Sequence, residues 1–557
     1  MPSEAENGKV AAVCGIAETA LVRIVLTLLL LGLVASAPAD ELRQPVPGVH
    51  ALVDVRIVTA PGEVIESGTV VIRDGLITAV GADIDVPPDA RLHEFEQTDD
   101  DAPVTVYPGL IDPYVAVEGE QDDEDEEVPA GRHHLVNPDR TLRARDWPED
   151  RVDGLRRAGF TTALMAPADG LLRGSGLIAN LGDGGLRSNL IEADFARLAS
   201  FDGRAEGRNF PNSLMGAVAL VRQTFDDARW QASARAAWQR NPSQPRPEWF
   251  EGLDALAPVF DGTTPLIFES QDMIDSLRIL EFIEPGDIDL VMVGHGAEYQ
   301  RLSRLAERSV PQILTLDFPE APDVSDADDR NVSLEELRHW QRAPDNIREV
   351  MEAGIDVLLT SHKLGQPGEI FGQLEKAIER GLDADAALAA LTTAPAAWLG
   401  LDELAGRIAP GAMANLVVVE GELMTDSPAI SQVWIDGRQH VLAAIVPPEV
   451  DPAGTWELTL GLGDMGDVDA SLELSGPPRN MQGALTVMGN ETPLTEARVS
   501  GDRLIASIDA SRFGGSGTIS IRITIDGDRA RGNGSGPFGE FTIRGRRTSG
   551  PDDEEVL

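Results

Sequence analysis

The alternation of apolar and polar positions divides the chain into three stretches with different patterns. From Ala51 to about Glu94, short apolar runs alternate with turns, and Asp74-Gly75 between two of these runs predicts a β-hairpin. Between residues 106 and 404, strand-like runs alternate with helix-like segments, which is typical of an α/β barrel. After Pro447-Pro448, short alternating runs separated by regular turns predict an antiparallel β domain.

Several short apolar runs in the middle stretch are candidates for barrel strands. The run at 159–165 follows a helix predicted at 151–158, and each later run is followed by helical periodicity. Gly381 is placed to end a helix at 369–380, and Asp383 is placed to cap the next helix at 384–391. The later strand candidates are residues 265–268, 289–293, 312–316 and 356–360.

A first barrel strand, entered through a turn at Pro108-Gly109, is predicted at residues 106–118. The sequence of this stretch is Val-Tyr-Pro-Gly-Leu-Ile-Asp-Pro-Tyr-Val-Ala-Val-Glu. Here the chain resembles the amidohydrolase superfamily, in which Pro-Gly-Leu-Ile-Asp is followed by x-His-x-His and the two imidazoles hold a catalytic metal. Tyr114 and Ala116 stand at those two positions in this sequence. The resemblance therefore implies the fold of the family and argues against its usual chemistry. We interpret Asp112 as a brace for the turn rather than as a ligand.

Further motifs that resemble this superfamily, in its imidazolonepropionase-like branch, are scattered over about residues 50 to 442. They include the pattern v-I-r-D-G-l-I at 71–77, Gly-Phe-Thr-Thr at 159–162 and Thr-Thr-Ala-Pro-Ala at 392–396. Residues 173–177 and 210–224 look like a divergent, secreted branch. The resemblance implies a (β/α)8 TIM-type barrel inserted in a discontinuous small β-sandwich, with a C-terminal antiparallel β domain added after it.

These patterns together predict the following order of domains along the chain. A signal peptide (1–39) precedes the first half of the β-sandwich (40–105), the amidohydrolase-like barrel (106–404), the second half of the sandwich (405–446), the C-terminal β domain (450–548) and a disordered tail (549–557).

The N-terminal segment predicts export to the periplasm or beyond. Arg23 precedes an apolar run at 24–35, and the small residues Ala37-Pro38-Ala39 follow. The run is too short to span a hydrocarbon core of about 30 Å but suits a signal peptide, with an uncleaved anchor as the alternative. Cys14 is the only cysteine, so a mature chain has neither disulfides nor thiolate ligands, and after cleavage we expect no membrane span.

The charge of the chain limits its partners. The 93 acidic and 46 basic residues give a formal net charge of −47, which repels phosphate backbones and anionic membranes, so we expect no nucleic-acid partner. Lysine occurs only at Lys9, Lys363 and Lys376, so nearly all of the positive charge is arginine. The acidic run at 118–127 and the pair His133-His134 are interpreted as solvated loops.

The resemblance implies where ligands of a metal would stand. The family takes them from x-His-x-His after strand 1, from a Lys or Glu after strand 4, from a His after each of strands 5 and 6, and from an Asp after strand 8. The strand 4 ligand is not assigned to any residue here, and that region contains no lysine. The ligand positions after strands 5, 6 and 8 fall on Glu269, His295 and His362, respectively.

Three interpretations of these residues stay open. Glu269, His295 and His362 are competent ligands by type, so they can form a rebuilt site for one divalent metal, with zinc as the expected ion. Alternatively the metal is lost, no cofactor is needed, and both histidines are merely hydrogen-bonded. In the third interpretation, His362 acts as a general base in metal-free hydrolysis.

The leading functional prediction is an amidohydrolase-superfamily hydrolase with an altered metal site. It would act on a C–N bond of a small-molecule or peptide-like substrate. The alternative is a catalytically inactive pseudoenzyme that serves as a periplasmic binding or assembly protein. The sequence contains no G-x-S-x-G, H-E-x-x-H or G-x-x-x-x-G-K-[ST] motif. The absence of these motifs argues against a serine hydrolase with a nucleophile elbow, a zincin and a P-loop nucleotide-binding protein, respectively. The sequence does not indicate the oligomeric state.

Overall fold

The computed structural model describes most of the chain between residues 48 and 550. The predicted signal peptide (1–39) with Cys14, most of the acidic run at 118–127 and most of the predicted tail lie outside the described residues. Within 48–550, the description leaves out residues 96–102, 120–132, 204–209, 284–285, 287, 323–331, 443–449, 462–465, 477, 479–480, 488, 501, 510–517 and 537–538.

The first sheet combines strands from both sides of the barrel segment. Its order is β16-β15-β14-β5-β1-β2-β3, and β4 pairs with β1. Asp74 and Gly75 have positive φ angles of 51° and 87° and connect β2 to β3, which confirms the predicted hairpin. The strands are β1 (Val49–Ala60), β2 (Glu63–Arg73), β3 (Leu76–Gly81), β4 (Arg91–His93), β5 (Val104–Pro108), β14 (Leu416–Glu420), β15 (Ala429–Ile435) and β16 (Arg438–Val441).

The second sheet is a nearly closed barrel of eight strands that follow one another in the order of the chain. Its strands run parallel except β8, which is antiparallel to both β7 and β9. Only residues 168–171 connect β7 to β8, which is too short for the helical crossover that a parallel strand requires. The strands are β6 (Leu110–Val117), β7 (Phe160–Pro167), β8 (Leu172–Asn180), β9 (Leu190–Ser200), β10 (Leu266–Glu269), β11 (Leu290–Val293), β12 (Gln312–Thr315) and β13 (Val357–Thr360).

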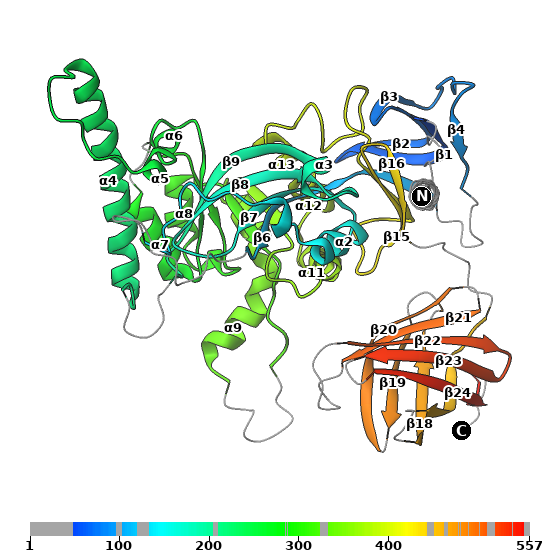
Figure 1. Ribbon diagram of the computed structural model, residues 1–557. Coiled ribbons are helices and arrows are strands. Elements are labelled where there is room, and N and C mark those ends of the chain that lie inside the picture. Colours follow the sequence, from blue (N-terminus) through cyan, green and yellow to red (C-terminus); the bar gives the residue numbers. More distant parts are fainter. Residues whose placement is uncertain are drawn as a thin grey trace, which may run out of the picture.

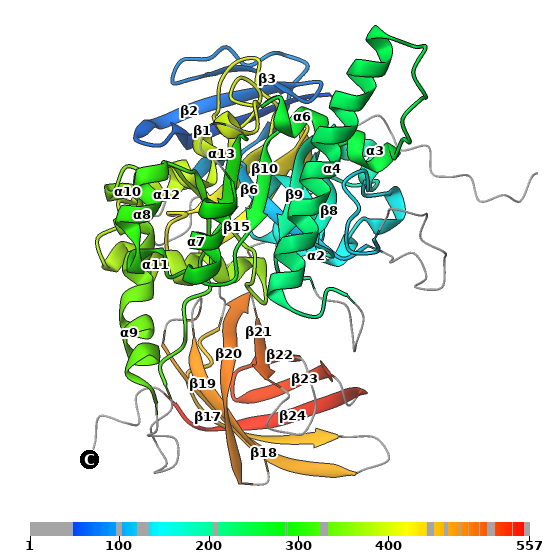
Figure 2. The ribbon, with the colours of Figure 1, turned by 90° about the vertical axis from the view of Figure 1, so that its left-hand side faces the viewer.

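Helices of the middle stretch flank the barrel strands (Figure 2). The predicted cap at Asp383 is confirmed, because its side chain accepts a hydrogen bond of 2.9 Å from the backbone nitrogen of Ala386. The helices are α2 (Glu149–Arg157), α3 (Leu186–Asn189), α4 (Leu214–Arg240), α5 (Glu251–Asp254), α6 (Ala257–Phe260), α7 (Met273–Phe282), α8 (Leu302–Arg308), α9 (Leu334–Arg342), α10 (Asn346–Glu352), α11 (Ile370–Glu379), α12 (Ala384–Leu391) and α13 (Thr393–Trp398), with short 3-10 turns at 144–146, 298–300, 343–345 and 367–369.

Asp112 connects the two end strands of the barrel sheet. The backbone ladder of the described residues runs from β13 to β6 without pairing these two strands directly. The fully buried Asp112 carboxylate accepts hydrogen bonds from the Thr360 hydroxyl at 2.7 Å and from the Ser361 hydroxyl and backbone nitrogen at 2.6 and 3.1 Å. Asp112 is therefore a brace, but it braces the junction of β6 and β13 rather than the turn at Pro108-Gly109.

Asn415 connects the first sheet to the barrel. Its side-chain amide donates to Thr162 on β7 at 3.2 Å and to Asn180 on β8 at 3.0 Å. Its oxygen accepts from the backbone nitrogen of Asp436 at 2.8 Å. The inserted barrel is thus held to the sheet from which it emerges by hydrogen bonds as well as by apolar contacts.

The C-terminal stretch forms a second, closed barrel in which every strand is antiparallel to its neighbours (Figure 1). The predicted antiparallel β domain is confirmed, and β24 pairs with β17 to close it. Apolar side chains such as Trp456 and Leu504 fill its interior. The strands are β17 (Gly454–Gly461), β18 (Asp467–Ser475), β19 (Gln482–Val487), β20 (Asn490–Ser500), β21 (Arg503–Asp509), β22 (Thr518–Asp526), β23 (Arg529–Gly536) and β24 (Gly539–Ser549).

Across the part of the chain that the structure describes, no helix has both the length and the apolar character needed to cross a lipid bilayer.

We predict that Asp112→Asn destabilises the barrel. Each carboxylate oxygen accepts from a backbone N–H, one from Tyr114 and the other from Ser361, so an amide NH2 in either place would face a donor. A buried donor left without an acceptor costs about 1 to 3 kcal/mol. Urea unfolding followed by far-UV circular dichroism should show this loss, and Asp317→Asn, at an exposed aspartate after β12, is the matched control. Equal stability of both variants would disprove the bracing role.

Candidate functional site

Four side chains from four separate segments meet at one end of the first barrel. Glu269 ends β10 and His362 follows β13, so these two lie where parallel strands end, and Tyr114 lies within β6. Arg173 lies at the start of β8. Because β8 runs in the opposite direction, its first residues lie at the same edge as the ends of the parallel strands.

Glu269 is the centre of a hydrogen-bonded network. One carboxylate oxygen accepts from the Arg173 guanidinium at 2.5 Å and from the Tyr114 hydroxyl at 3.0 Å. The other oxygen lies 3.3 Å from Nε2 of His362 and accepts from the Gln271 amide at 3.1 Å. Arg173 also donates to the Tyr114 hydroxyl at 2.9 Å. Each charged or polar group at the centre therefore has a partner.

The network is almost completely buried. The side chains of Arg173 and Glu269 are 6% and 8% exposed, and that of His362 is 16% exposed. Burial alone raises the pKa of Glu269, but the hydrogen bond with His362 and the charge of Arg173 outweigh it and hold this pKa below its usual value. Burial raises the pKa of Tyr114. At neutral pH the site therefore contains a carboxylate, a guanidinium and a neutral phenol.

The structure brings Glu269 and His362 together but places His295 in a different cluster. The His295 backbone nitrogen donates to Glu298 at 2.7 Å, and its Nε2 lies 3.6 Å from the same oxygen. Glu298 is fully buried and also accepts from the Asn346 amide at 2.6 Å. The turn that makes this contact passes through Gly296, whose φ is 89°.

The residues present do not fit the metal that the family resemblance implies. Within the described ranges, no group of three or more His, Cys, Asp and Glu side chains is arranged to hold a metal ion. Protein sites for zinc use at least three such ligands, whereas Glu269 and His362 supply two. Arg173 also places a positive charge directly on the Glu269 carboxylate. The predicted set of Glu269, His295 and His362 is therefore not assembled as a metal site.

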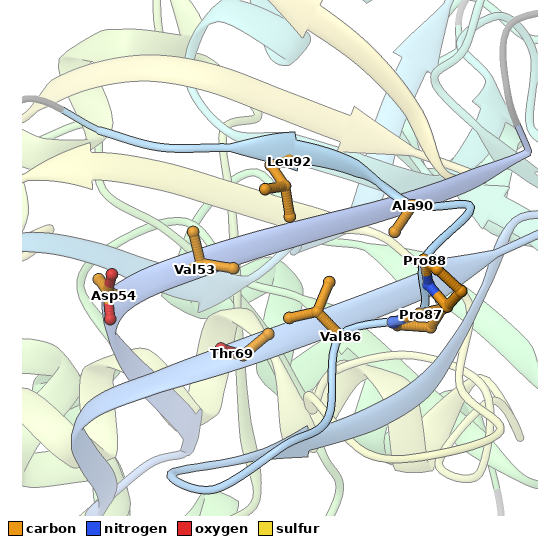
Figure 3. Close-up of a pocket in the computed structure, with 8 residues that line it drawn as sticks. All are labelled: Val53, Asp54, Thr69, Val86, Pro87, Pro88, Ala90 and Leu92. Atoms are coloured by element: carbon orange, nitrogen blue, oxygen red, sulfur yellow. The ribbon is translucent and has the colours of Figure 1, made fainter.

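Two other features are not part of this hydrogen-bonded network. His133 accepts from the Leu135 backbone nitrogen at 3.1 Å and lies 2.7 Å from the Phe210 carbonyl oxygen, so both of its ring nitrogens have partners. An open pocket of about 520 Å³ lies on the first sheet, where Val86 lies near Val53 and Thr69 (Figure 3). Its lining is mainly apolar and includes no catalytic pair.

Arg173 is the residue of the site that sequence reasoning missed. In the sequence, the segment 173–177 shows only a resemblance to the family, because a regular barrel would place a helix rather than a reversed strand after β7. A signal for it exists in the sequence. Residues 168–171 are too few for a crossover, which predicts a hairpin and hence a side chain at the mouth.

Comparison with known proteins identifies the fold. Residues 341–440 match the amidohydrolase family. This segment contains His362 but not Tyr114, Arg173 or Glu269. A sequence search of curated proteins finds no match.

Many solved structures are similar to the chain. An amidohydrolase from Thermotoga maritima MSB8 has 17% identity and a TM-score of 0.53, over 70% of this chain and 98% of that chain. A Xaa-Pro dipeptidase with bound methionine in the active site has 15% identity and a TM-score of 0.43, over 71% and 100% of the two chains. Molinate hydrolase has 16% identity and a TM-score of 0.42, over 71% and 95%. The first likeness supports the shared fold, and the expected resemblance to the amidohydrolase superfamily is confirmed at that level.

We predict that Glu269→Gln destabilises the protein by about 3 to 5 kcal/mol, because Arg173 would remain buried without its counter-charge. Urea unfolding at pH 7 measures this cost. The double variant Arg173→Met/Glu269→Gln should recover much of the loss, since no buried charge remains. A double variant less stable than Glu269→Gln would contradict this account.

The same pair predicts the direction of a pH dependence. The pKa of Glu269 is lower in the folded chain than in the unfolded chain, where it is about 4.3. The ionised Glu269 side chain therefore makes its full contribution to the free energy of unfolding above that pH. The contribution is lost as the pH falls from about 4.3 towards the folded-state pKa. Glu269→Gln should therefore lower the dependence of unfolding free energy on pH in this acidic range.

Proposed function

We propose that this chain, which has the amidohydrolase barrel and matches the family over residues 341–440, is a metal-free and non-hydrolytic member of that group. Its barrel mouth would serve to bind a small-molecule or peptide-like ligand or to support an assembly. The observation that carries the proposal is the 2.5 Å ion pair between Arg173 and Glu269, which occupies a carboxylate that a metal would need.

The chemistry of the mouth supports absence of hydrolysis. Hydrolysis of an amide needs an activated water or side-chain nucleophile. Ser361 is fully buried and its hydroxyl donates to Asp112 at 2.6 Å, so it is held away from such a role. Glu269 is already bonded to Arg173 and Tyr114, and its low pKa makes it a weak base. Of the network, His362 is the residue whose type suits a general base.

His362 supports a second candidate function, metal-free hydrolysis. A carboxylate beside one imidazole nitrogen fixes the orientation of the ring, as in other catalytic pairs. The 3.3 Å contact with Glu269 uses Nε2, so Nδ1 would take a proton from the attacking water. The oxygen of that water would bond to the carbonyl carbon, the C–N bond would then break, and the proton held by Nδ1 would pass to the nitrogen of the leaving amine. The 16% exposure of the His362 side chain is compatible with access of water.

We predict that the purified protein contains far less than one metal per chain after exposure to zinc and dialysis, because two ligands beside a guanidinium form a poor site. Elemental analysis of the wild type, His362→Ala and the exposed control His134→Ala should give the same background value. A panel of amide and dipeptide substrates should show no hydrolysis above the rate without protein.

Two outcomes would overturn the leading proposal. Stoichiometric metal that is lost only in His362→Ala would restore a metal site. Hydrolysis that resists chelators, disappears in His362→Ala and persists in His134→Ala would establish the metal-free hydrolase instead.

Export remains part of the proposal and depends on the apolar run at 24–35 after Arg23. We predict that the chain, expressed with its native N-terminus in a Gram-negative host, is recovered outside the cytoplasm and begins near Asp40. N-terminal sequencing of the periplasmic fraction tests this. A full-length chain retained in the cytoplasm would refute export, and a full-length chain in the membrane fraction would indicate an anchor.

A further inference from the structure

The outer wall of the second barrel carries a group of exposed arginines that has no role in the site described above. We propose that this group binds the surface of a membrane rich in anionic phospholipids. The arginines, called here the arginine face, lie on the adjacent strands β21 to β24 and are Arg503, Arg522, Arg529, Arg531, Arg544 and Arg546.

The register of β23 and β24 brings like charges together. Arg529 is paired directly with Arg546, and Arg531 is paired directly with Arg544. Their neighbours Ala530 and Ile543 are buried inside the barrel, so all four guanidinium groups project outward on one face. Like charges directly opposite each other on paired strands destabilise a sheet. The presence of two such pairs in successive rows of β23 and β24 therefore indicates that these arginines serve a purpose other than the stability of the sheet.

The arginine face is only partly neutralised by its surroundings. Among the described residues, the face makes one ion pair, 3.8 Å between Arg503 and Asp502. Glu457 lies opposite Arg546, and Asp526 lies opposite Arg529, so acidic residues border the end of the face near the β22–β23 turn. The next row, with Arg531 and Arg544, has Thr524 and Thr459 as its outer neighbours instead.

The strong negative charge of the whole chain does not cancel this local charge. Residues 503–549 contain eight arginines and four acidic residues, a net charge of +4, whereas residues 454–502 carry −6 and the full chain −47. At physiological salt, charges separated by more than about 8 Å are largely screened from each other in solvent. A surface that approaches β23 and β24 therefore meets the arginines first. The acidic regions further away repel that surface only weakly.

The shape and composition of the arginine face favour a phosphate-bearing surface as the partner. Guanidinium groups bind phosphate oxygens in a bidentate manner. Neighbouring strands lie about 4.8 Å apart and outward residues about 7 Å apart along a strand, so the array extends in two dimensions rather than along one line. Among the described residues of β17 to β24, no large apolar side chain is exposed, which argues against base stacking and against insertion into the hydrocarbon core.

Vesicle co-sedimentation of the full chain tests the proposal. We expect binding to vesicles of phosphatidylglycerol mixed with phosphatidylcholine at about 50 mM salt, little binding at about 300 mM salt, and none to pure phosphatidylcholine. Arg531→Gln/Arg544→Gln should reduce binding to the anionic vesicles by about tenfold or more. The matched control Arg240→Gln/Arg338→Gln removes the same charge from exposed positions of α4 and α9 and should bind like the wild type.

Thermal unfolding separates a binding defect from a folding defect. Because it removes a repulsive cross-strand pair, Arg531→Gln/Arg544→Gln should be at least as stable as the wild type. Arg531→Lys/Arg544→Lys, which keeps the charge, should keep most of the binding. Absence of wild-type binding to anionic vesicles at low salt, or equal loss in the control variant, would overturn the proposal. Binding to soluble polyphosphate but not to vesicles would also overturn it.

Discussion

The buried ion pair between Arg173 and Glu269 is the interaction on which the barrel mouth depends. Either charge alone would be very costly at this depth, so the two side chains must remain together and must have further hydrogen-bonding partners. Tyr114 and His362 supply those partners, and the network thereby joins β6, β8, β10 and the segment after β13. Two residues before Tyr114, Asp112 joins β6 to β13 where the backbone ladder does not.

The reversed strand β8 determines which side chain reaches the mouth of the barrel at this place. A parallel strand in this place would begin at the far end of the barrel, whereas β8 begins at the mouth and delivers Arg173 there. The guanidinium then provides the positive charge that balances Glu269. The strands on both sides of β8 contribute buried apolar side chains to the core.

The distribution of charge over the second barrel, rather than the net charge of the chain, determines which surfaces this barrel attracts. One half of its sequence is basic and the other half is acidic, although the chain as a whole is strongly acidic. Screening over about 8 Å makes the local arrangement decisive for anything that touches the surface. The conclusion from net charge, that anionic membranes are repelled, therefore applies to the chain on average and not to β23 and β24.

The sequence by itself determined the elements whose signal is local. Apolar periodicity and turn residues located β1 to β3, β10 to β13 and the helices α11 and α12, and the residues Tyr114 and Ala116 already argued against the usual metal pair. Only the tertiary structure decided which of these elements meet. It reversed β8, joined Arg173 to Glu269, placed His295 with Glu298 instead, and aligned the arginines of β23 and β24. Such pairings depend on strand direction and register between distant segments, and a local pattern of apolar and polar residues does not specify them.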